Sequence, residues 1–161
     1  MAVVTASGTR IFIGPAVTEA DADTIAEFRD LSPYTEITEV ENYGEYGDES
    51  PLVNFVSVGD GRVRKTKGAR DAGTMTLVVG RDPLDAGQNL LVAAEQTKFE
   101  YAFKIVHADA PTEDYSNSED YFRAIVSSRR ANIGENDNVV RRTFNLAINS
   151  EVFESPAAEL T

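Results

Sequence analysis

The chain of 161 residues contains no cysteine, and its one histidine is His107. Without cysteine, disulfides and thiolate metal sites are excluded, while the redox compartment stays open. The N-terminus has no charged segment before an apolar core, and no run of the sequence approaches the length of a membrane span. We therefore expect a protein that is made in a cytoplasm and carries neither a signal peptide nor a membrane anchor.

Basic residues are also scarce, since 15 Lys and Arg stand against 27 Asp and Glu, which gives a formal net charge of −12. A protein that coats nucleic acid needs accumulated positive charge to neutralise phosphates, so this composition argues against that function. The length is that of one domain with a sizeable core.

Patterns for catalysis or ligand binding are incomplete. His107 follows a predicted strand without a cysteine or serine partner. Residues 68–74 have the glycine spacing of a phosphate-binding loop, but they lack its lysine and precede a strand. Asp21 and Asp23 resemble the start of a calcium loop whose glycine and final glutamate are missing. The sequence therefore predicts no enzyme, no cofactor and no metal site.

Alternation of apolar and polar residues predicts a mainly β protein. One helix is expected over residues 83–95, with Asp82 as its N-cap and Pro83 in its first position. Leu84, Gly87, Leu91 and Ala94 would share its buried face, and Gly87 would permit close packing on a sheet. A shorter helical pattern spans residues 18–31. The expected strands cover residues 9–17, 34–40, 53–58, 62–66, 75–79, 100–106, 121–126 and 139–149, with residues 127–138 as a turn-rich connection.

These elements predict a β-sandwich or open β-barrel of about six or seven strands, with one flanking helix and a long hairpin. The expected organisation is a flexible arm over residues 1–8, a domain over residues 9–150 and a C-terminal arm over residues 151–161.

The hairpin is the most unusual feature of the chain. Asp60-Gly61 can supply the positive φ angles of a tight turn. Five basic residues fall within nine positions after that turn, whereas residues 19–50 hold eleven acids and only Arg29 to oppose them. We interpret the basic hairpin as an arm that binds a neighbouring copy of the same protein. The basic residues are Arg62, Arg64, Lys65, Lys67 and Arg70.

Several stretches carry a resemblance to a known family. They are GTRIFIG near the start, EITEVENYGEYGDES, DGRVRKTKGARDAGTMTLVVGRDPLDAGQNLLVAA, and DYFRAIVSS with IGENDNVVRRTFNLAINS. In these stretches the chain resembles the major tail tube proteins of long, non-contractile bacteriophage tails. The resemblance covers Gly8–Ser150, with the central stretch the most specific part, and residues beyond Ser150 match no pattern of the family.

The resemblance implies a virion protein that assembles into stacked hexameric rings, in which strands of the subunits form a continuous barrel around a channel. The tape-measure protein occupies the channel first, and DNA later passes through it as non-specific cargo. Asn42–Ala72 would be the loop that projects to the adjacent ring. Beside the five basic residues, the candidate contacts between subunits are Tyr43 and Tyr46. The candidate acidic counter-surface or lumen residues are Glu36, Glu39, Glu41, Glu45, Asp48 and Glu49.

Other functions stay open at this level. The chain could be a ligand-binding β-barrel whose hairpin covers a pocket mouth, and it would then be a monomer with a concave apolar site. It could also be a related ring-forming protein, such as a tail terminator or a secretion-system tube protein. An enzyme for an anionic substrate would need a clustered acid–base pair, which the sequence does not offer.

Overall fold

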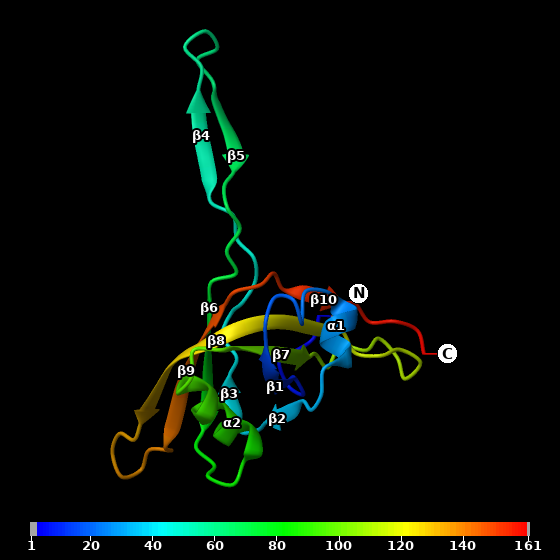
Figure 1. Cartoon of the computed structure of the whole chain (residues 1–161), viewed down its shortest axis with the longest axis vertical. Helices are drawn as coiled ribbons and strands as arrows, with labels where there is room; N and C mark the ends of the chain where they lie inside the picture. The colour runs from blue at the N-terminus through cyan, green and yellow to red at the C-terminus, as the bar shows by residue number, and fades with distance from the viewer. Residues whose placement is uncertain (1–2, 161) are drawn as a thin grey trace.

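The computed structural model describes residues 3–160, which form a mainly β body with a long hairpin projecting from it (Figure 1). The two helices are α1 (Ile25–Asp30) and α2 (Ala86–Glu95). The strands are β1 (Arg10–Val17), β2 (Thr35–Ile37), β3 (Val40–Asn42), β4 (Leu52–Val56), β5 (Val63–Lys67), β6 (Thr74–Gly80), β7 (Glu100–Val106), β8 (Glu119–Asn132), β9 (Arg141–Ile148) and β10 (Phe153–Ser155).

The body is built on one antiparallel sheet with the strand order β2-β1-β7-β8-β9-β6-β3, and β10 pairs with β8. The 14 residues of β8 connect two halves, because Glu119–Ala124 pair with β7 and Ala124–Asn132 pair with β9. The partner changes at Ala124, and a register shift between Val126 and Ser128 interrupts the pairing with β9 just beyond it. Within residues 3–160 the path ends at β2 and β3 without closing into a barrel, so the expected sandwich-like β fold is confirmed.

The core lies between the two halves of the sheet. Ile13 and Phe103 from one half and Leu77 and Phe144 from the other belong to a single buried cluster. Phe122 is fully buried in this cluster and stacks on Phe103, with ring centroids 5.5 Å apart. Alternating apolar residues in these strands therefore supply the inner faces, as the sequence pattern predicted.

A smaller cluster covers the outer side of the first half. Helix α1 is capped by Thr24, whose side chain accepts a hydrogen bond from the Glu27 amide. The helix buries Phe28 against Tyr121 and Phe153. The pattern in residues 18–31 is thus a real helix, although it is only 6 residues long.

Helix α2 starts later than predicted. Its N-cap is Asp85, which accepts a hydrogen bond from the Gln88 amide, so the expectations for Asp82 and Pro83 were wrong. Leu84 precedes the helix and is 91% exposed, which also corrects its assignment to the buried face. Asp82 instead accepts a hydrogen bond from the Leu84 amide in the turn that precedes the helix, and Asp85 takes the N-cap position.

The predicted close packing at Gly87 is confirmed. A Cβ atom at this position would lie 2.2 Å from the Glu36 carbonyl oxygen, because α2 rests on the backbone of β2. We expect Gly87→Ala to lower the free energy of unfolding by about 1–3 kcal/mol, since neither backbone can yield easily. Thermal unfolding measures this change. Gly59→Ala is the control, because no atom lies within 4 Å of the added Cβ there, and an equal effect at both sites would contradict the packing argument.

Three strand boundaries differ from the sequence analysis. The strand expected over residues 34–40 is split into β2 and β3 by a turn at Thr38-Glu39. Strand β8 continues through Asn132 into the expected connection, because its distal part pairs with β9. The C-terminal segment adds β10 and a bridge between Tyr115 and Glu159, so residues 153–159 lie against their own subunit.

At the N-terminus, residues 3–8 of the expected arm are exposed, and residues 1–2 lie outside the described part of the chain, as does Thr161. No helix within residues 3–160 is long and apolar enough to cross a membrane.

Candidate functional site

The candidate site is the hairpin formed by β4 and β5, which pair with each other in a two-stranded sheet separate from the body. All ten residues of the two strands are exposed. Figure 1 shows the hairpin extending well beyond the body. An isolated two-stranded hairpin is marginally stable in water, so a partner surface would stabilise it considerably.

The strand register divides the hairpin into two faces. Cross-strand partners lie on the same face, because side chains alternate along each strand. Phe55 pairs with Arg64 on one face, and the Phe55 side chain is 63% exposed. The opposite face, which we call the lysine face, consists of Leu52, Asn54, Val56, Val63, Lys65 and Lys67.

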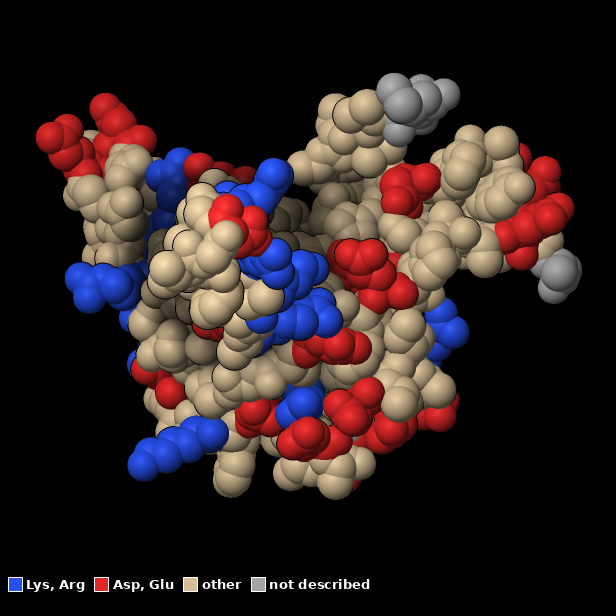
Figure 2. All heavy atoms as spheres, turned by 90° about the horizontal axis from the view of Figure 1, so that it is seen from above, with Lys and Arg blue, Asp and Glu red and all other residues tan. Residues whose placement is uncertain are grey.

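The basic residues therefore do not form one patch. Lys65 and Lys67 lie on the lysine face beside three aliphatic side chains. Arg64 lies on the other face and forms an ion pair of 2.5 Å with Asp60 in the turn. Viewed from above, Lys and Arg side chains gather along the hairpin, and Asp and Glu side chains gather on the body beside it (Figure 2).

The turn differs from the expected two-residue type. Gly61 has a positive φ of 63°, but Asp60 does not, so a turn with positive φ at both positions is excluded. The amides of Asp60 and Gly61 both donate to the Ser57 carbonyl oxygen, at 3.2 and 3.0 Å. The strands consequently end at Val56 and begin again at Val63, which leaves a longer tip that exposes Val58.

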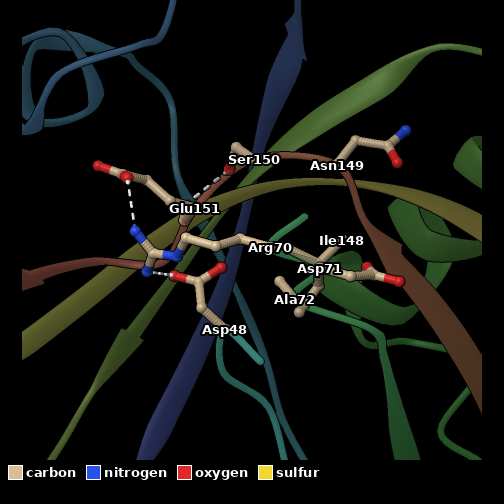
Figure 3. Close-up of a pocket in the computed structure, with 8 residues that line it drawn as sticks. All are labelled: Asp48, Arg70, Asp71, Ala72, Ile148, Asn149, Ser150 and Glu151. Atoms are coloured by element: carbon tan, nitrogen blue, oxygen red, sulfur yellow. Dashed lines mark hydrogen bonds and ion pairs between the residues drawn. The ribbon is translucent and has the colours of Figure 1, made fainter. Parts of the chain in front are cut away.

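The base of the hairpin is fixed to the body. Glu49 and Asp71 exchange two backbone hydrogen bonds of 2.8 Å, which join the two arms of the hairpin where they leave the body. Arg70 extends from the base between two carboxylates, with its guanidinium 2.8 Å from Asp48 and 3.8 Å from Glu151 (Figure 3). These groups line a polar cavity of about 330 Å³. Arg70 thus links the base of the hairpin to the C-terminal segment of its own subunit, whereas the ion pair of Arg64 lies within the hairpin.

Tyr43 and Tyr46 are also placed within the subunit, on the segment that leads to the hairpin. The Tyr43 hydroxyl donates to the Thr9 carbonyl oxygen at 2.5 Å. The Tyr46 hydroxyl donates to Asp120 and lies 3.1 Å from His107 Nε2. Burial raises the pKa of both phenols, so they stay neutral donors across the physiological range. The two rings anchor the segment to the body.

The six candidate acids fall into two groups. Glu36, Glu41 and Asp48 form ion pairs with Arg10, Arg141 and Arg70. The hydrogen bond from Arg10 lowers the pKa of Glu36. Glu39, Glu45 and Glu49 are exposed on the body. Three of the six acids are therefore partnered within the subunit.

Features that might support chemistry are limited in the described residues. His107 Nε2 lies 2.7 Å from Asp120, and together with Tyr46 this cluster cross-links β7, β8 and the segment before the hairpin. Residues 3–160 contain no group of three or more His, Cys, Asp or Glu side chains suited to a metal ion. Residues 68–74 lead into β6 and not into a helix, as expected from the sequence.

A cavity of about 240 Å³ beside Tyr43, Tyr46 and His107 has a mainly apolar lining. Pockets that bury a small organic ligand usually measure about 300–1,000 Å³. The cavity is below that range, so it gives the ligand-binding alternative little support.

The sequence did not predict the burial of two residues near the start of α2. Gln88 is a fully buried polar side chain, and Leu84 is a fully exposed apolar one. A second possible N-cap at Asp85 was the available signal, because a helix that starts there places Leu84 outside it.

Comparisons with known proteins agree with this architecture. A model of the family described as phage tail tube protein, TTP, matches residues 4–154. A search of curated proteins finds no match. Among solved structures, the SPP1 tail tube is 14% identical with a TM-score of 0.61, and the alignment covers 95% of this chain and 78% of that one.

Two further structures share the fold. The baseplate of the anti-feeding prophage is 8% identical with a TM-score of 0.68, and 97% of this chain and 98% of that chain are covered. A PVC sheath/tube terminator from an extracellular contractile injection system is 12% identical with a TM-score of 0.64, covering 96% and 98%. Since the family model spans nearly the whole chain, the chain belongs to the phage tail tube protein family and is a component of the virion tail.

Proposed function

We propose that this tail tube protein forms hexameric rings that stack through the β4–β5 hairpin into a channel for DNA. The observation that carries the proposal is the hairpin itself, whose strands expose apolar residues on both faces. Exposed apolar surface of this kind marks an interaction site. In a family of tube proteins, the simplest partner for this surface is another copy of the same chain.

Free sheet edges support closure into rings. Beyond Ala124, β8 pairs with β9 on one side and leaves its other edge without a strand, within the described residues. Strand β3 pairs with β6 and is the opposite edge of the same four strands, β8-β9-β6-β3. If the β8 edge of one copy paired with the β3 edge of the next, neither edge would stay unpaired, and the copies would form a closed ring. Six-fold symmetry is proposed by analogy with the anti-feeding prophage baseplate, whose structure is 6-fold symmetrised.

The outward face of β6 and β9 is a candidate channel lining. Thr76, Asn145 and Ser128 point away from the core and form a continuous chain of hydrogen bonds of 3.0 and 2.8 Å. These three small neutral side chains, on a protein with a net charge of −12, would offer phosphates few attractive contacts, and the same face carries Arg130 opposite Thr143. Such a channel suits the tape-measure protein and then DNA as passing cargo.

Under this proposal the protein is not an enzyme. Its candidate site residues make or support contacts with other subunits and do not bind a substrate. The hairpin provides contacts between rings, while Tyr43, Tyr46 and Arg70 act from within the subunit by fixing the segment that carries it. The exposed acids Glu45 and Glu49 lie near the base and would repel other acidic surfaces during assembly.

The testing experiment is charge reversal at Arg64 and Lys67. We expect the double variant to remain a folded monomer, because both side chains are exposed, and to fail to form tubes in negative-stain microscopy of concentrated protein. Lys98→Glu is the control, since Lys98 is exposed on the body after α2. Normal tubes from the double variant would show that the hairpin charges do not contribute to stacking.

A further inference from the structure

One corner of the body is held in an unfavourable backbone conformation. Glu39, in the turn between β2 and β3, has a φ of 60°, and no other non-glycine residue in 3–160 has a positive φ. A side chain in this region strains the backbone, so it persists only where surrounding contacts impose it. Strain of this kind at an exposed glutamate suggests that the carboxylate serves a purpose.

The imposing contacts come from β6 and α2. The Glu39 carbonyl oxygen accepts a hydrogen bond of 2.7 Å from the Gly80 amide. The Thr38 amide donates to Asp85 at 3.1 Å, and the Thr38 carbonyl oxygen accepts from Gln88 at 3.1 Å. The amide and carbonyl of Thr38 and the carbonyl of Glu39 are thus tied to the start of α2 or the end of β6.

Gln88 connects the whole corner. Its amide nitrogen also donates to the Gly80 carbonyl oxygen at 2.9 Å, and its side-chain oxygen accepts from the Asp82 amide at 3.1 Å. Because Gln88 is buried and fully hydrogen-bonded, the turn at Glu39 and the segment carrying Asp82 and Leu84 form one rigid unit. We call the unit formed by Glu39, Asp82 and Leu84 the acceptor corner.

The acceptor corner lies at the end of the body remote from the hairpin. Strand β6 starts at Thr74 beside the hairpin base and ends at Gly80 in the corner, a span of about 20 Å at about 3.3 Å per residue. Figure 1 shows the segment between β6 and α2 at the opposite end of the molecule from β4 and β5. A hairpin at one end and its acceptor at the other can join copies head to tail without limit.

We propose that the acceptor corner binds the lysine face of the hairpin of a second copy of this chain. The proposal rests on the proposed stacking of rings and names the surface that receives the hairpin. Leu84 is an almost completely exposed apolar side chain that can cover Val56 and Val63. The carboxylates of Glu39 and Asp82 face two lysines whose own face carries no acid.

The strain at Glu39 allows a decisive test. Glu39→Gly removes the carboxylate and also the strain, because glycine adopts positive φ freely. We expect the thermal midpoint of the monomer to stay equal or rise, while the protein concentration needed for tube growth rises about tenfold, as for loss of one close charge pair. A purely structural role for Glu39 predicts a change in stability without a change in assembly, which would overturn the proposal.

A charge exchange identifies the partner. We expect Glu39→Lys alone and Lys65→Glu alone to impair tube growth, and the double variant to recover at least part of it. Leu84→Ser should weaken growth without affecting the fold. If the Arg64 and Lys67 double reversal blocks tubes but Glu39→Lys and Leu84→Ser assemble normally, stacking through the hairpin stands and the acceptor corner is refuted.

Discussion

Replacing Leu52–Lys67 with a short Gly-Ser linker is expected to abolish stacking completely while the body remains folded. The excised strands make their paired contacts with each other, and none of their residues belongs to a buried cluster. The chain ends left by the excision are already adjacent, because the Gly68 amide donates to the Pro51 carbonyl oxygen at 2.6 Å. Circular dichroism and thermal unfolding should match the parent protein, and tubes should be absent from micrographs.

A mixing experiment extends this prediction. A subunit without the hairpin keeps its acceptor corner, so it can receive the hairpin of a normal ring but offers none to the next. Small amounts of the shortened protein should therefore end growing tubes and reduce their mean length in proportion to the amount added. A control protein with the hairpin intact and Gly59→Ala in its tip should mix without shortening. Unchanged tube lengths in the first mixture would contradict stacking through the hairpin.

Much of the fold follows from local patterns in the sequence. Alternation in residues 100–106 predicted β7, and the glycine at position 87 predicted close contact between a helix and a strand. Both signals are local, because the alternation of side chains along a strand and the absence of a Cβ atom in glycine can each be seen within one element. The projecting hairpin was likewise visible from the two expected strands, 53–58 and 62–66, on either side of Asp60-Gly61.

What the sequence did not reveal depends on pairing between distant segments. Strand β8 extends to Asn132 because β9 lies beside it, although its last residues have the polarity of a loop. The split of residues 34–40 depends on Gln88 and Gly80, which lie more than 40 residues away and hold the turn at Glu39. The separation of the lysines from Arg64 needed the register of the hairpin, and that register is a property of both strands together.

The anchoring of the hairpin segment to the core leads to the other large effect. Phe122 is fully buried and contacts the ring of Phe103 on β7, at 5.5 Å between centroids, and the ring of Tyr46, at 5.9 Å. Tyr46 in turn bonds to Asp120 and contacts His107. The side chain therefore supports both the inner sheet and the segment that leads to the hairpin.

We expect Phe122→Ala to lower the free energy of unfolding by about 3–5 kcal/mol, because a buried ring is lost and the rigid strands around it cannot close the cavity. Against a typical total of about 5–15 kcal/mol, this loss is large enough to unfold a marginal monomer. Urea unfolding measures it, and Phe122→Leu should recover part of the loss if the variant with alanine does not fold.

Phe99→Ala is the matched control, since Phe99 is 64% exposed and the same substitution there should change stability by less than about 0.5 kcal/mol. Similar losses at both phenylalanines would show that burial does not decide the effect. A folded Phe122→Leu protein should still form tubes at higher concentration, because its hairpin and acceptor corner are unchanged and only the support beneath Tyr46 is looser.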